Sequence, residues 1–212
     1  MKAAILSNGM INNVDFLRSF IKSSDIFICA DGGARYARML SIDPDILVGD
    51  FDSLAAETLD YFKNAGVNII TYPKEKDYTD TQLAIDKAIE LGCGEMVLLG
   101  MTGNRLDHTL ANIDMLYYLY KRGIDAEICD EFNRIRLLRG ENKLIGKEGD
   151  TISFIPFFGD IKKITLKGFY YSLEDERLTK DVSLGVSNLF LGKEGYVNTG
   201  EDFVLAIYSH DV

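Results

Sequence analysis

The feature of this sequence that most constrains its fold is a regular alternation of short apolar runs with helix-like stretches over the first 130 residues. The runs are rich in Ile, Val and Leu, which is typical of strands buried on both faces of a sheet. Between most of them apolar residues recur at helical spacing, as at Leu110, Ile113 and Tyr117. This alternation predicts a mostly parallel sheet flanked by helices. The expected strands are 3–7, 26–30, 46–48, 67–71, 96–99 and 126–129, and the expected helices are 14–22, 34–40, 54–64, 81–91 and 108–122.

The pattern changes near residue 131, beyond which no stretch has convincing helical spacing. Short extended candidates follow, separated by turn signals such as Arg139–Asn142 and Asn198–Glu201. They predict a smaller antiparallel β-sandwich or barrel. The fold class is therefore α/β, with domains at 1–130 and 131–212, and the thin second core is expected to lean on the first domain or on a second chain. The expected strands are 135–139, 151–156, 164–166, 169–173, 196–198 and 203–208.

Composition excludes several classes of protein. The 212 residues carry 23 basic and 33 acidic side chains, a net charge of -10, which argues against a nucleic-acid partner because such binding needs a basic face. No apolar run approaches the roughly 20 residues that span a bilayer, so no membrane association is expected. The three cysteines are widely spaced and odd in number, which favours a reducing, cytoplasmic location over a disulfide framework.

Four motifs carry the chemistry, and all of them follow predicted strands or open predicted helices. The first is Asp31-Gly32-Gly33, where glycine lets the backbone approach a ligand and a helix N-terminus favours phosphate. A tight strand-to-helix turn with a capping Asp is the alternative interpretation.

The second motif places Asp50 and Asp52 two residues apart after a strand. That spacing points both carboxylates the same way, and because like charges repel they need a cation. Mg²⁺ prefers a few carboxylates together with substrate phosphates. Alternatively, Asp52 caps the next helix and Asp50 is a turn residue.

The third motif is Lys76-Asp77-Tyr78-Thr79-Asp80, ahead of a predicted helix. Thr79 or Asp80 suits the helix N-cap, and Lys76 is placed to steady a phosphate.

The fourth motif is Gly103-Asn104-Arg105-Leu106-Asp107-His108. Arg105 offers a bidentate fork for phosphate and Asp107 adds a carboxylate, whereas a helix-capping or core role is expected for His108. Because ligands of open α/β sheets bind at the carboxyl edge of the strands, the four motifs together predict a Mg²⁺-nucleotide site there. No Walker A lysine loop and no kinase catalytic-loop signature occurs in the sequence.

The order and spacing of these motifs resemble the thiamine pyrophosphokinase (thiamine diphosphokinase) family. The segment Gly185-Val186-Ser187-Asn188 also resembles that family's motif in its β-rich second domain. The resemblance covers nearly the whole chain. It implies that the first domain binds nucleotide and Mg²⁺ and is catalytic, whereas the second binds thiamine.

The resemblance implies transfer of a diphosphate group from ATP to the hydroxyethyl oxygen of thiamine, which gives thiamine diphosphate and AMP. On this basis we hypothesise that Asp50, Asp52 and Asp80 hold Mg²⁺ and that Asp107 completes the set of catalytic carboxylates, where a carboxylate can receive the alcohol proton. The residues then expected to bind ATP or its phosphates are Asp31, Gly32, Gly33, Lys76, Asp77, Thr79 and Arg105.

The resemblance further implies that Ser187 and Asn188 bind thiamine, and that the enzyme is a homodimer whose sites are shared between chains. Thiamine is a cation, and the acidic net charge of the chain suits it. The chain has no Trp, so an aromatic side chain stacked on thiamine must be Phe or Tyr, and Phe190 is the first candidate.

Two alternative functions stay open at the level of the sequence. A metal-dependent glycosyltransferase also uses an Asp-x-Asp pair, but this hypothesis leaves Asp77, Asp80 and Arg105 without a role. A non-catalytic nucleotide or thiamine sensor would bind the same ligands without releasing AMP.

Overall fold

The computed structural model of the chain describes residues 1–210 and consists of two compact units, Met1–Glu131 and Phe132–Val212. In the first unit six strands form one sheet in the order β6-β5-β1-β2-β3-β4, and every neighbouring pair is parallel. The predicted parallel sheet is confirmed. The strands are β1 (Lys2–Leu6), β2 (Ile26–Ala30), β3 (Ile46–Gly49), β4 (Asn68–Thr71), β5 (Glu95–Leu99) and β6 (Asp125–Cys129).

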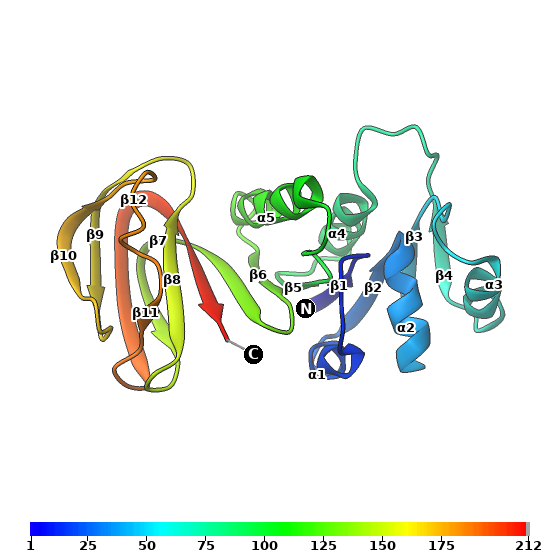
Figure 1. Cartoon of the computed structure of the whole chain (residues 1–212). Helices are drawn as coiled ribbons and strands as arrows, with labels where there is room; N and C mark the ends of the chain where they lie inside the picture. The colour runs from blue at the N-terminus through cyan, green and yellow to red at the C-terminus, as the bar shows by residue number, and fades with distance from the viewer. Residues whose placement is uncertain (211–212) are drawn as a thin grey trace. The chain divides into compact units, whose positions relative to one another are not determined.

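Helices cover both faces of this sheet (Figure 1). On one face Leu17, Ala37 and Phe62, from three different helices, pack into one apolar core with strand residues such as Leu6 and Cys29. The helix at Asp80–Glu90 lies against β1, β2 and β3, and the helix at Leu106–Tyr120 lies against β6. The helices are α1 (Leu17–Lys22), α2 (Ala34–Leu40), α3 (Ala56–Asn64), α4 (Asp80–Glu90) and α5 (Leu106–Tyr120), with short 3₁₀ turns η1 (Val14–Phe16) and η2 (Asp31–Gly33).

The strand order reverses between β1 and β5. From β1 the chain adds β2, β3 and β4 on one side, then returns through α4 to place β5 and β6 on the other side of β1. The loops that leave the carboxyl ends of β1 and β5 therefore diverge at a topological switch point, which is where open α/β sheets form ligand crevices.

The second unit is built around one long strand, β12 (Glu194–Ser209), which pairs with β7 (Asn133–Ile145) along its length. Its first half also pairs with β9 and its second half with β8, so the chain is folded into two antiparallel layers. Buried rings including Phe154, Phe169 and Phe190 fill the core. The predicted antiparallel second half is confirmed, and residues 132–210 contain no helix. The other strands are β8 (Thr151–Pro156), β9 (Ile161–Lys167), β10 (Leu173–Leu178) and β11 (Asn188–Leu189).

Two predicted turns in this unit are wrong. Arg139–Asn142 and Asn198–Glu201 lie inside β7 and β12, opposite each other, where the register of the pair shifts. Gly140 and Gly200 have φ of 68° and 59°, and the Gly140 N–H donates to the Thr199 hydroxyl at 3.0 Å. Residues 199–202 of β12 face Gly140 alone, so the turn-like composition marks one irregularity of the pairing, on the β12 side, which shifts the register without ending either strand.

The predicted strand at 169–173 is also wrong. Only Phe169 forms a bridge, with Phe190, and the strand begins at Leu173. The Asn188 side chain accepts a hydrogen bond from the Tyr171 N–H at 2.9 Å and donates one to the Tyr171 carbonyl at 2.8 Å. A side chain therefore satisfies the backbone groups that a neighbouring strand would otherwise bind.

Among residues 1–210, no helix is long and apolar enough to cross a lipid bilayer.

Replacing Gly100 by Ala should destabilise the first unit strongly. Gly100 has a φ of 63°, and a Cβ at this position would collide with the Ser7 carbonyl oxygen. Gly92 is the matched control, since its φ is 80° but its Cβ would meet open space. We expect Gly92→Ala to cost about 1 kcal/mol of unfolding free energy from the left-handed backbone alone, and Gly100→Ala about 2 kcal/mol more. Urea denaturation measures both, and equal losses would contradict the packing argument.

Candidate active site

A cavity of about 460 Å³ opens at the carboxyl edge of the first unit, at the switch point between β1 and β5. Its walls come from the loops after β1, β2 and β5 and from the first turns of α4 and α5. Among the predicted site residues, Asp31, Thr79, Asp80 and Arg105 line it. It is also lined by five residues that were not predicted from the sequence: Ser7, Asn8, Gly9, Met10 and Arg35. Ser7 is the last residue of the first predicted strand and Asn8 and Gly9 follow it, so the strand-end rule applied to this strand would have found all three.

Backbone pairing beyond the sheet shapes this cavity. The loops after β1 and β5 continue side by side, with Gly9 N–H donating to the Gly100 carbonyl at 2.8 Å and Met10 N–H to the Thr102 carbonyl at 2.9 Å. The buried Tyr36 hydroxyl donates to the Gly9 carbonyl at 2.7 Å. These bonds fix the cavity wall to the core of the unit.

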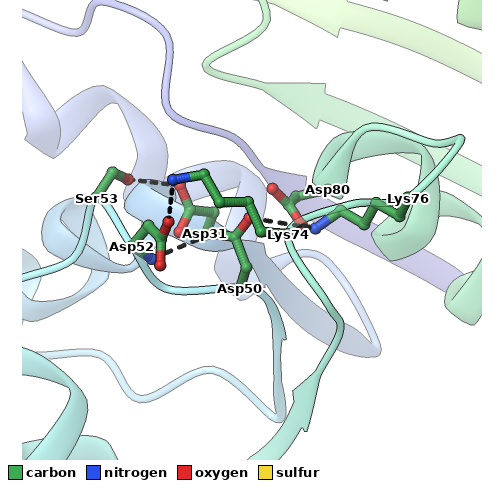
Figure 2. A network of polar contacts seen from close by, with 7 residues as sticks. All are labelled: Asp31, Asp50, Asp52, Ser53, Lys74, Lys76 and Asp80. Carbon is green, nitrogen blue, oxygen red and sulfur yellow. Dashed lines mark hydrogen bonds and ion pairs between the residues drawn. The ribbon is translucent and has the colours of Figure 1, made fainter.

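Four aspartates from three segments gather beside the cavity, and we call them the carboxylate cluster: Asp31, Asp50, Asp52 and Asp80 (Figure 2). Asp31 follows β2, Asp50 and Asp52 follow β3, and Asp80 begins α4. Because β2 and β3 are parallel neighbours, their carboxyl ends meet at the same edge. The two segments predicted to hold the metal ion, which carry Asp50, Asp52 and Asp80, lie together, and Asp31 lies beside them.

Asp31 is held in an uncommon backbone conformation, with a φ of 42°. The Ser53 hydroxyl donates to its Oδ2 at 2.5 Å. Its other oxygen, Oδ1, is buried and has no hydrogen-bond partner among residues 1–210. Since a buried carboxylate oxygen without a partner is costly, this atom is a candidate ligand for a cation.

Lys76 lies between two members of the carboxylate cluster. Its Nζ is 2.6 Å from Asp80 Oδ1 and 3.6 Å from Asp50 Oδ2, and its side chain is only 13% exposed. Burial lowers the pKa of Lys76, but the hydrogen bond and charge of Asp80 and the charge of Asp50 outweigh this, so the pKa lies above its usual value. Burial also raises the pKa of Asp80; the charges of Asp31 and Asp50 add to this, and Lys76 only partly offsets it.

Lys74 holds the remaining carboxylate. Its Nζ is 2.5 Å from Asp52 Oδ2, in a pair of which the Lys side chain is 76% exposed. The hydrogen bond and charge of Asp52 raise the pKa of Lys74. The Asp52 N–H in turn donates to Asp50 Oδ1 at 3.1 Å, so the two aspartates of the Asp-x-Asp pair are linked through the backbone.

The cluster suits a divalent cation by its donor chemistry rather than by a preformed cage. Within the described part of the chain, no group of three or more His, Cys, Asp or Glu side chains is already arranged as a metal site. Carboxylate oxygens are nevertheless the ligands that Mg²⁺ prefers, and Asp50 and Asp80 already converge on one cationic group. The orphaned Oδ1 of Asp31 adds an unfilled acceptor beside them.

Thr79 is the N-cap of α4, because its hydroxyl accepts the Gln82 N–H at 3.2 Å. This confirms one of the two capping residues expected from the sequence. Asp77 is exposed on the preceding loop and does not line the cavity. Gly32 and Gly33 are buried, and a Cβ on them would collide with the Asn8 side chain and the Leu6 carbonyl, respectively. These glycines therefore seat the turn after β2 against β1 and its loop.

Arg105 and Asp107 form an exposed pair at the start of α5. Arg105 Nε lies 3.1 Å from Asp107 Oδ1, and Nη2 lies 2.5 Å from Oδ2. The hydrogen bond from Arg105 lowers the pKa of Asp107 to about 2. The expectation of a capping or core role for His108 is wrong, since its side chain is exposed, lines the cavity and makes no cap to α5. Its place on the first turn of α5 points it toward the cavity instead.

In the second unit, Ser187 and Asn188 precede and begin β11. Ser187 is exposed with a φ of 56°, whereas Asn188 is buried and binds the Tyr171 backbone. Phe190 is 1% exposed, between Phe169 and Tyr208, so the idea that it stacks on a ligand is wrong. Tyr170 and Tyr171 are the exposed aromatic residues that the Asn188 contact brings next to this segment.

Comparison with known proteins assigns both units to the same family. Residues 17–128 match the family model described as thiamin pyrophosphokinase, catalytic domain, and residues 134–204 match thiamin pyrophosphokinase, vitamin B1 binding domain. The chain is 32% identical over 209 residues to a curated thiamine pyrophosphokinase of Bacillus subtilis, covering 98% of each. Crystal structures of thiamine pyrophosphokinases from Bacillus subtilis and Geobacillus thermodenitrificans superpose with TM-scores of 0.91 and 0.87 at 30% and 28% identity, covering the whole of this chain and 100% and 98% of theirs.

Replacing Arg105 by Ala should raise the pKa of Asp107 from about 2 toward the ordinary value of about 3.9, since the largest cause of the low value is the Arg105 hydrogen bond. In the wild type the pair is intact at neutral pH and is lost only as the pH falls through about 2. Carboxyl-detected NMR titration of both proteins measures the shift. An unchanged titration of Asp107 in the variant would show that the pair does not form in solution.

Proposed function

The chain belongs to the thiamin pyrophosphokinase family, and from this premise we propose how it transfers the diphosphate group of ATP to the hydroxyethyl oxygen of thiamine, yielding thiamine diphosphate and AMP. The observation that carries the proposal is that carboxylates from three separate segments converge, with two lysines, beside a cavity at the switch point of the sheet. A triphosphate bound in that cavity reaches the carboxylate cluster at its edge.

The cavity suits a nucleotide. Arg35 and Arg105 line it and offer guanidinium groups to phosphate oxygens. The N-termini of α4 and α5 open at the same cavity, and helix N-termini favour negative charge. Asp31 lies at the boundary between the cavity and the carboxylate cluster.

We assign Asp50, Asp52 and Asp80 to hold Mg²⁺, with Asp31 Oδ1 beside them. Bound there, the ion supplies neutralisation of the charge on the phosphate oxygens. Because the net negative cluster would repel a bare triphosphate, nucleotide and metal are expected to bind together.

The residues of the chain contribute alignment of the two substrates, because phosphoryl-type transfer needs little covalent chemistry from the protein. Lys76 and Arg105 hold phosphate oxygens, so that the thiamine oxygen attacks the β-phosphorus while the bond from that phosphorus to the AMP oxygen breaks on the opposite side. The hydroxyl proton passes to a phosphate oxygen or to water. Asp107, with a pKa of about 2, is a weak base, and its assigned role is to orient Arg105. Thr79 keeps α4 and therefore Asp80 in place.

The second unit supplies the thiamine site in this proposal. Ser187 is exposed at its loop, Asn188 anchors the Tyr171 backbone, and the exposed rings of Tyr170 and Tyr171 replace Phe190 as candidates to stack on thiamine. The enzyme acts in the cytoplasm as a homodimer, in which the second unit of one chain completes the site of its partner. The small core of this unit supports association with a second copy.

Incubation of the purified chain with Mg²⁺, ATP and thiamine should yield thiamine diphosphate and AMP in equal amounts, detected by mass spectrometry. Asp50→Asn should lower turnover by about a thousandfold or more, as expected when a charge-stabilising ligand is lost. Circular dichroism checks that the variant remains folded. A sensor would release no AMP, and a glycosyltransferase would consume a UDP-sugar instead of ATP; wild-type-like turnover of Asp50→Asn would defeat the metal assignment.

Two inactive variants should complement each other if the site is shared between chains. Ser187→Arg places a cation at an exposed position of the proposed thiamine site, where it repels cationic thiamine. Mixed with Asp50→Asn and allowed to exchange subunits, it should restore roughly a quarter of wild-type activity, because half of the dimers are mixed and each of these has one intact site. Light scattering gives the oligomeric state. A monomer at micromolar concentration, or no recovery on mixing, would contradict the shared site.

A further inference from the structure

Lys74 and Lys76 bind carboxylate oxygens of the carboxylate cluster that a metal ion would need as ligands. Lys76 Nζ contacts Asp80 and Asp50, and Lys74 Nζ contacts Asp52 (Figure 2). All three aspartates assigned to Mg²⁺ are therefore bound to an ammonium group in the structure. Both lysines come from the loop between β4 and α4, drawn in teal in Figure 1, which contains no regular element between Thr71 and Asp80.

We propose that Lys74 and Lys76 are tethered cations that hold the carboxylate cluster together before the metal arrives, and that metal binding is an exchange in which the ion displaces them. This inference rests on the proposed function only for the identity of the ion. In the exchange the Lys76 ammonium leaves Asp50 and Asp80 and becomes free to bind the phosphates that accompany the metal.

The need for a tethered cation follows from charge. Lys76 Nζ lies 2.6 Å from Asp80 Oδ1 and 3.6 Å from Asp50 Oδ2, so these two carboxylates are close enough to repel each other. Without a cation, mutual repulsion would drive the segments after β2, β3 and β4 apart or protonate one of them. A lysine supplied by an adjacent loop prevents this without the translational entropy cost of recruiting a free ion.

The ion pairs that Lys74 and Lys76 form with the aspartates differ in strength. The Lys76 contacts join side chains that are 13%, 18% and 23% exposed, whereas the Lys74 pair is 76% and 54% exposed. Water and salt screen an exposed pair far more than a buried one. Lys76 is therefore the main competitor of the metal, and Lys74 a weaker one.

The test is metal affinity without nucleotide or thiamine. We expect the full-length Lys76→Met variant to bind Mn²⁺ roughly tenfold more tightly than the wild type, measured by the EPR signal of the free ion, because no buried ammonium must be displaced. Lys74→Met, the matched exposed control, should bind about two- to threefold more tightly. Lys76→Arg keeps the charge and should stay near the wild type.

The same Lys76→Met variant should turn over more slowly than the wild type, because it lacks the cation that moves to the phosphates. Tighter metal binding together with slower turnover separates this role from a purely structural one, which would weaken both. Unchanged or weaker Mn²⁺ binding by a folded Lys76→Met variant would overturn the exchange. This outcome would leave the production of thiamine diphosphate and AMP by the wild type, and hence the proposed function, unaffected.

A measurement on the wild type keeps the proposal testable if Lys76→Met does not fold. Acetylation of lysines by acetic anhydride, mapped by mass spectrometry, should be slow at Lys76 in the metal-free protein and several times faster when Mg²⁺ alone is added. The exposed Lys63, 3.4 Å from Asp60 on α3, is the internal reference and should not change. Equal rates at Lys76 with and without Mg²⁺ would overturn the proposal.

Discussion

Repulsion between like charges at one edge of a parallel sheet is the constraint on which the rest of this structure depends. The sheet brings Asp31 and Asp50 together because the carboxyl ends of the neighbouring parallel strands β2 and β3 meet there, and the first residue of α4 adds Asp80 beside them. The structure compensates their charge with two lysines from a neighbouring loop. The same compensation explains why three of the four carboxylates of the carboxylate cluster, Asp50, Asp52 and Asp80, contact ammonium groups.

The cavity and the carboxylate cluster are two consequences of one topology. The reversal of strand order between β1 and β5 opens the cavity, while β2 and β3 on one side of β1 supply the carboxylates. The loops after β1 and β5 stay close because their backbones pair beyond the sheet. The core of the first unit thus positions both the residues that line the cavity and the carboxylate cluster.

The second unit is organised by the strand pairing of β12 and by one side chain that replaces a missing strand neighbour. Its long strand β12 changes partner from β9 to β8, and between these two pairings the extra residues around Gly200, opposite Gly140, shift the register of β12 against β7. Asn188 uses its side chain in place of a missing strand neighbour and fixes the segment that exposes Tyr170 and Tyr171. A loop held in this way presents aromatic surface without burying it in the sandwich core.

The sequence by itself determined the fold class and the family. Hydrophobic periodicity fixes which face of each element is buried, and glycines and aspartates at strand ends are local signals with a local physical meaning. The sequence could not distinguish the single irregularity at Gly140 and Gly200 from two turns, because both structures use a left-handed glycine and differ only in whether the strand keeps its partner. Tertiary structure alone decided that Arg35 lines the cavity, that Phe190 is buried, and that Lys74 and Lys76 bind the carboxylates. These are contacts between residues distant in the chain or set by burial, and their energies depend on distances that only packing fixes.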